Sequence, residues 1–123
     1  MRKTAKFATT AVSLAALFAG ASMMPTVAGA ADAEQIKYGK EVAFDRKKGN
    51  CLSCHMMDDG VSPGDLGPPL IAMQARFPDR DKLRAQIWDA QVANPGTRMP
   101  PFGKHQALSE KEIDAIVDYL YTL

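Results

Sequence analysis

The feature that most constrains this chain is a pair of cysteines three positions apart, Cys51 and Cys54, with His55 directly after the second. A disulfide between them would close a very small loop and constrain the unfolded chain little. They are the two cysteines of the sequence, so no other bridge can form within the chain. A chain of 123 residues builds a small hydrophobic core, which often needs a stabilising cross-link or bound group, here called a staple. We therefore expect a staple other than a disulfide.

The motif Cys51-Leu52-Ser53-Cys54-His55 has the spacing that is typical of c-type haem attachment. Each thiol can add to one vinyl group of a porphyrin, and two intervening residues let one turn of chain reach both vinyls. The histidine that follows then lies under the iron, where a ring nitrogen can bind it. We predict one covalent haem c, held by Cys51 and Cys54, with His55 as an axial iron ligand.

Three other uses of the motif stay open at this point. A thioredoxin-like redox pair shares the cysteine spacing but needs a βαβ context, and no alternating strand pattern is present. A structural zinc site needs four ligands. The candidates would be Cys51, Cys54, His55 and His105, and the adjacent Cys54 and His55 can hardly both face one tetrahedral ion. An unmodified disulfide is the third alternative.

The first 30 residues have the pattern of a cleaved export signal. A basic start precedes an apolar stretch over residues 12–21, and Ala28-Gly29-Ala30 supplies small residues for cleavage. We expect residues 1–30 to be a signal peptide, residues 31–123 to form one domain, and the protein to lie in the periplasm. An uncleaved anchor is the alternative. The stretch is only mildly hydrophobic, so we predict no stable membrane anchor.

The charge of the segment after residue 30 excludes one class of partner. It holds twelve basic and fourteen acidic residues, a formal charge of −2 with histidine neutral. Nucleic-acid binding needs a clustered basic face. We therefore predict no nucleic-acid partner.

Helical periodicity predicts an all-α domain with three helices. The first covers about residues 33–45, with Asp32 as a possible cap. The second covers about residues 80–90, with Asp79 or Asp81 as cap. The third covers about residues 110–121, where Ser109 and Glu112 fit a capping box. Between them lie two stretches rich in proline and glycine, residues 62–69 and 94–103, and such loops are usually functional.

The second of these loops supplies the predicted second iron ligand. Met99 lies in Thr97-Arg98-Met99-Pro100-Pro101-Phe102, and the two prolines limit the entropy lost when a thioether is held in place. Methionine with histidine is a usual ligand pair in cytochromes c. We predict Met99, with His105 as the alternative. The methionines set aside are Met56 and Met57, which adjoin His55, and Met73, which we expect in the core.

The first loop contains Gly67-Pro68-Pro69-Leu70. Proline lacks an N–H but keeps a carbonyl that can accept, and a metal-bound histidine usually donates its other N–H to such a group. We predict that the Pro68 carbonyl accepts from Nδ1 of His55 and that Leu70 packs on the haem. An ordinary proline-rich turn is the alternative.

Taken together, these motifs resemble the class I cytochromes c. The attachment motif, the Gly-Pro-x-Leu loop and the Met-Pro loop follow in that family's order, and the resemblance covers about Ile36 to Leu123. It implies a small all-α fold in which the N-terminal and C-terminal helices cross closely around a covalently bound haem. Gly39 matches the small residue at that crossing.

A narrower resemblance is to the SoxX family, the monohaem cytochrome subunits of the sulfur-oxidation (Sox) system. The segments that carry it are residues 76–80, 83–90, 93–95 and 99–105. The resemblance implies a heterodimer with a SoxA-like cytochrome subunit and electron transfer to a downstream c-type cytochrome. The SoxAX complex is an L-cysteine S-thiosulfotransferase that couples thiosulfate oxidatively to a cysteine of a carrier protein.

Two other functions compete with that interpretation. The chain could be a free-standing periplasmic electron shuttle, or an enzyme or sensor whose open iron site binds a small ligand. We expect no independent catalysis, because no acid–base or nucleophile constellation accompanies the motif. Arg76 and Arg98 are hypothesised to contact a partner subunit, with binding of a haem propionate as the alternative role.

Overall fold

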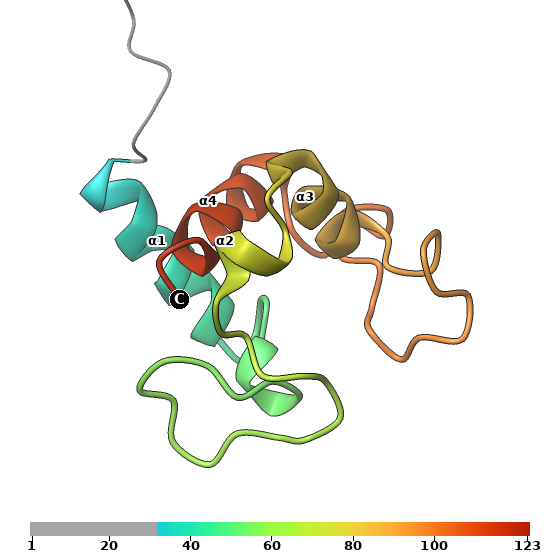
Figure 1. The fold of residues 1–123 in the computed structure, drawn as a ribbon, viewed down its shortest axis with the longest axis horizontal. Coiled ribbons are helices and arrows are strands. Elements are labelled where there is room, and N and C mark those ends of the chain that lie inside the picture. Colours follow the sequence, from blue (N-terminus) through green and yellow to red (C-terminus); the bar gives the residue numbers. More distant parts are fainter. Residues whose placement is uncertain (1–31) are drawn as a thin grey trace, which may run out of the picture.

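The computed structural model describes residues 32–123, so the predicted signal peptide lies outside the described residues. Within that range the chain forms helices and no strand, which confirms the all-α prediction (Figure 1). The elements are α1 (Ala33–Phe44), the short 3-10 helix η1 (Cys51–Ser53), α2 (Met73–Arg76), α3 (Arg80–Trp88) and α4 (Glu110–Leu120). No helix in residues 32–123 is long and apolar enough to cross a membrane.

The first and last helices lie side by side, and their closest approach is at Gly39 (Figure 1). A Cβ added to Gly39 would lie 1.9 Å from the carbonyl oxygen of Ala115 in α4. Both residues are fully buried. The predicted close crossing is therefore present, and it requires a residue without a side chain.

The helix starts agree with the predicted caps. Asp32 accepts a hydrogen bond from the backbone N–H of Glu34, at 3.1 Å. At α3 the cap is Asp79, which accepts from the N–H of Asp81. At α4, Ser109 and Glu112 form the capping box, with each side chain accepting from the other residue's backbone N–H. These ends are specified locally, which is why the sequence predicts them.

The end of α3 is where the helix prediction was wrong. The sequence placed it near Ala90, but α3 ends at Trp88. The Trp88 carbonyl accepts instead from the backbone N–H groups of Gly103 and Lys104, at 3.1 and 3.2 Å. This contact with a distant loop replaces the next helical hydrogen bond. The one-turn helix α2 was not predicted either, because one turn is too short to show periodicity.

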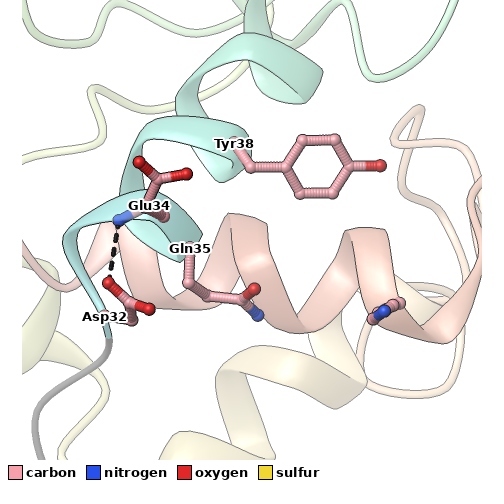
Figure 2. Close-up of a pocket in the computed structure, with 5 residues that line it drawn as sticks. Asp32, Glu34, Gln35 and Tyr38 are labelled. Atoms are coloured by element: carbon pink, nitrogen blue, oxygen red, sulfur yellow. Dashed lines mark hydrogen bonds between the residues drawn. The ribbon is translucent and has the colours of Figure 1, made fainter.

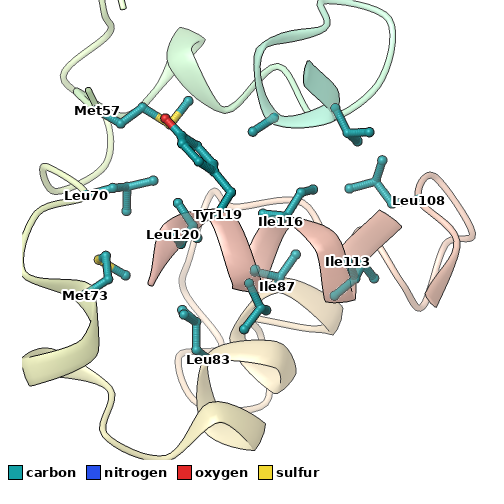
Figure 3. Close-up of a cluster of buried hydrophobic side chains, with 13 residues drawn as sticks. Met57, Leu70, Met73, Leu83, Ile87, Leu108, Ile113, Ile116, Tyr119 and Leu120 are labelled. Atoms are coloured by element: carbon teal, nitrogen blue, oxygen red, sulfur yellow. The ribbon is translucent and has the colours of Figure 1, made fainter. Parts of the chain in front are cut away.

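The hydrophobic core is built around α4 (Figure 3). The predicted apolar stripe of α4 is buried, with no member more than 4% exposed: Ile113, Ile116, Val117 and Leu120. Leu83 and Ile87 of α3 pack into the same cluster. The segment after η1 adds Met57, Leu70 and Met73, and the predicted place of Met73 in the core is confirmed. The core thus joins the segment between η1 and α2 to the helices.

Replacing Gly39 with alanine should destabilise the folded protein. Alanine is the better helix former by about 1 kcal/mol, but its Cβ would overlap the backbone of α4. Backbone atoms cannot move away as a side chain can, so we expect a net loss of at least about 2 kcal/mol. Thermal or denaturant unfolding of the purified protein measures it.

The matched control is Gly96→Ala. The nearest atom to an added Cβ there is Asn94 Oδ1, at 3.7 Å, which is ordinary contact. Its free energy of unfolding should change by less than about 0.5 kcal/mol. Equal effects of the two substitutions would contradict the close crossing at Gly39.

Candidate haem site

The three residues of the motif lie on a single turn at η1. The backbone N–H groups of Cys54 and His55 both donate to the carbonyl of Cys51, at 3.1 and 2.8 Å. Asn50 enters the turn with a φ of 46°, a left-handed conformation that asparagine tolerates well. Both cysteines are half-buried and are not bonded to each other. The turn therefore offers two thiols and one imidazole within a short stretch of chain.

The orientation of the imidazole is fixed by the first loop. Nδ1 of His55 lies 2.7 Å from the carbonyl oxygen of Pro68. A carbonyl can only accept, so Nδ1 carries a proton, and in the neutral imidazole Nε2 then has the free lone pair. This is the arrangement in which a metal-bound histidine is commonly held. The ring is thus prepared to ligate a metal through Nε2.

Gly67 makes this orientation possible. A Cβ at that position would lie 2.3 Å from Cε1 and 2.5 Å from Nδ1 of His55. The backbone N–H of Gly67 donates to the carbonyl of Cys54, at 2.8 Å, which holds the loop against the motif. The sequence analysis did not assign this role to Gly67. The sequence feature that could have indicated this role is the position of Gly67 directly before the two prolines.

Further contacts attach the chain on either side of the first loop, between η1 and α2, to the helices. Leu70, which is buried, donates its N–H to the carbonyl of Met56, at 2.8 Å. Lys40 of α1 pairs with Asp58 and Asp59, at 2.7 and 2.8 Å. Tyr119 of α4 donates to Asp58 as well, at 3.2 Å. The hydrogen bond from Lys40 lowers the pKa of Asp58 below its ordinary value. Sequence reasoning missed this cluster, whose members are far apart in the chain.

The environment of Cys51 does not fit a redox-active pair. Burial raises the pKa of its thiol to about 11. Reactive thiols of thioredoxin-like pairs have a lowered pKa instead. The zinc alternative also lacks support, because residues 32–123 contain no group of three or more histidine, cysteine or acidic side chains able to hold a metal ion.

The second loop, which carries Met99, is fixed to the end of α3. Gly103 packs so closely on the ring of Trp88 that an added Cβ would lie 2.2 Å from it. Lys104 pairs with the buried Asp89, at 2.7 Å. Met99 is half-buried and packs against the hydrophobic core, while His105 is exposed. The loop thus presents Met99, and not His105, to the interior.

A separate surface hollow lies at the start of α1 (Figure 2). It is lined by Asp32, Glu34, Gln35, Tyr38 and Lys111. It offers no thiol and no imidazole, and the Asp32 carboxylate already caps α1. This hollow is not suited to attach a haem.

The all-α fold and the thiol–imidazole turn define a small c-type cytochrome. The chain belongs to the cytochrome c family described as "Cytochrome C oxidase, cbb3-type, subunit III", which matches residues 34–120. Members of this class hold a haem c covalently and transfer electrons. The match begins within α1 and ends at the last residue of α4, so it covers nearly all of the described fold.

One curated relative is also similar to this chain. It is an uncharacterized lipoprotein of Aquifex aeolicus (strain VF5), 34% identical over 85 residues. The aligned part is 68% of this chain and 40% of that protein, so the chain spans about two fifths of the relative's length. An uncharacterized relative assigns neither a cofactor nor a substrate to this chain.

The residues present fit a covalent haem c. The motif supplies two thiols in one turn. His55 supplies a ring nitrogen, Nε2, that can ligate iron, while its Nδ1 is already hydrogen-bonded to the Pro68 carbonyl. Several apolar side chains that pack against the core are only half-buried, and they include Leu52, Trp88, Met99 and Phe102. Covering such partly exposed apolar side chains with a large apolar group is favourable.

Replacing Gly67 with alanine should disturb ligation by His55. The new Cβ would overlap the imidazole, so the ring must leave the Pro68 carbonyl or move away from its position. We expect a lower fraction of low-spin iron in the haem-loaded protein, measured by absorption and paramagnetic resonance spectra. Gly96→Ala is the control, and an unchanged spectrum in Gly67→Ala would refute the proposed packing.

Proposed function

We propose that this protein is a monohaem electron-transfer cytochrome in which Cys51 and Cys54 bind the haem and His55 and Met99 ligate its iron. We further propose that it is the SoxX-like subunit of a SoxAX-type complex. The observation that carries the haem assignment is the turn of η1, where two thiols adjoin an imidazole held by the Pro68 carbonyl.

The bound haem would supply a reversible one-electron couple, and the protein's residues would control it. The two thioethers would keep the group attached in an exported protein. The Pro68 carbonyl fixes the ring of His55 and raises its basicity. Leu70, buried in the core, would line the haem pocket. The stiff loop around Met99, attached to Trp88, would keep a weak thioether ligand in place.

The assignment to a Sox complex rests on the resemblance over residues 76–105. Several of these residues have structural roles here. Arg76 contacts the first loop, while Trp88 and Gly103 fix the second. In such a complex the sulfur chemistry would belong to the SoxA-like partner, and this chain would receive electrons and pass them to another c-type cytochrome. Residues 1–30 would serve as the export signal to the periplasm.

The ligand assignment predicts different results for two substitutions. Met99→Ala should remove the weak far-red sulfur-to-iron absorption band of the oxidised protein, because no other thioether would bind the iron. His105→Ala should leave the band unchanged, since the His105 side chain is exposed. If His105→Ala removes the low-spin spectrum instead, the second ligand is His105. If Met99→Ala has no effect, the iron site is open or differently ligated.

The subunit assignment predicts a stable heterodimer. Native purification from the periplasm should yield this chain together with a second c-type cytochrome, at equal stoichiometry. Mixing the purified subunits with thiosulfate and the carrier protein should then reduce an added c-type cytochrome. A protein that elutes as a soluble monomer and exchanges electrons without a second subunit would favour the free-standing shuttle.

A further inference from the structure

Arg76 contacts the loop that holds His55, although it lies outside the motif. Its Nη1 donates to the carbonyl of Pro69, at 2.7 Å. The preceding residue, Pro68, provides the carbonyl that accepts from Nδ1 of His55, also at 2.7 Å. Two consecutive carbonyls are therefore each held by one side chain, and one peptide unit links the arginine contact to the histidine contact.

The proline pair depends on these side chains because it cannot hold itself. Neither Pro68 nor Pro69 has a backbone N–H, so the pair can be held only through its carbonyls and its neighbours. Gly67 and Leu70 on either side donate to the carbonyls of Cys54 and Met56. Within the pair, the two side-chain contacts fix the direction of the carbonyls.

Arg76 is itself anchored from two directions. It is the last residue of α2, whose first residue, Met73, is buried and donates its N–H to the carbonyl of Leu123, at 3.1 Å. Directly after α2, the Phe77 carbonyl accepts from the hydroxyl of Tyr121, at 2.7 Å. The guanidinium therefore extends from a fixed backbone, which lets it position the loop.

We propose that Arg76 is a positioning residue for the axial histidine, and that through Pro69 and Pro68 it lowers the reduction potential of the haem. The inference rests on the proposed ligation by His55. A well-aligned bond from Nδ1 to a carbonyl makes the imidazole a stronger electron donor, which stabilises ferric iron. Without Arg76, the Pro68 carbonyl would be less well aligned with Nδ1 of His55. The ferrous state of the iron would then become more stable relative to the ferric state.

The charge of Arg76 acts in the opposite direction. A positive charge favours the ferrous state, so removing it would by itself lower the potential. The side chain is exposed, so solvent and salt screen that effect. Loss of positioning and loss of charge therefore change the potential with opposite signs, and a measurement can separate them.

The test uses the haem-loaded full protein with two variants and one control. Arg76→Met removes both the contact and the charge. Arg76→Lys keeps the charge but lacks the planar guanidinium that suits this carbonyl. The control Arg80→Met removes the same charge and an ion pair with Asp118, but touches neither proline. The measurements are the midpoint potential and, by NMR of the ferrous protein, the exchange rate of the Nδ1 proton.

We expect Arg76→Met to raise the midpoint potential, which lowers the ferric-to-ferrous ratio at a fixed ambient potential by about two- to tenfold. The Nδ1 proton of His55 should exchange faster in the same variant. Arg76→Lys should show smaller changes in the same directions, and Arg80→Met should show none. If Arg76→Met does not fold with covalent haem, faster exchange of the His55 Nδ1 proton in Arg76→Lys supports the proposal instead.

Two results would overturn the inference. One is a lower potential in Arg76→Met with wild-type behaviour of Arg76→Lys, which is the signature of charge alone. The other is unchanged proton exchange in both variants. The proposed ligation fails separately, because a wild-type protein without covalent haem, or without a histidine ligand in its spectra, would show it before any variant is made.

Discussion

The close approach of α1 and α4 at Gly39 is the contact on which the rest of the structure depends. It holds α1 against α4, whose apolar side chains form the centre of the core. The chain after α1 folds back at once, with Gly49 donating to the carbonyl of Val42, at 3.2 Å. Cys51 follows two residues later. In the folded protein, the position of the thiols is therefore coupled to the packing of the helices.

The two loops are held by the same physical device, a helix end that supplies polar groups a proline-rich chain cannot supply for itself. Arg76, at the end of α2, donates to the first loop. At the end of α3, the Trp88 carbonyl accepts from the second loop and Asp89 pairs with Lys104. Prolines stiffen both loops but remove donors, so the orientation of each loop depends on neighbouring helices.

Local patterns were predicted well, and several contacts between distant segments were missed. The close crossing at Gly39 was expected from the family resemblance, and the bond from His55 to Pro68 from the usual chemistry of a metal-bound histidine. The caps at Asp32, Asp79 and Ser109 use contacts within three residues, and they formed as expected. The haem motif is local in the same sense. The contact of Trp88 with Gly103 joins separate segments and shortens α3, and no periodicity reports it. The partner contact hypothesised for Arg76 did not anticipate its bond to Pro69, for the same reason.

The pairing of α1 with α4 also bears on the order of events during folding. Its two helices lie at opposite ends of the described chain, so the contact closes a long loop and can form only once α4, near the C-terminal end, is available. An exported chain would leave the translocation channel before its main helix pair could assemble. We expect Cys51 and Cys54 to be accessible to a haem-attaching enzyme in that interval, and the finished core then to enclose a group that is already attached.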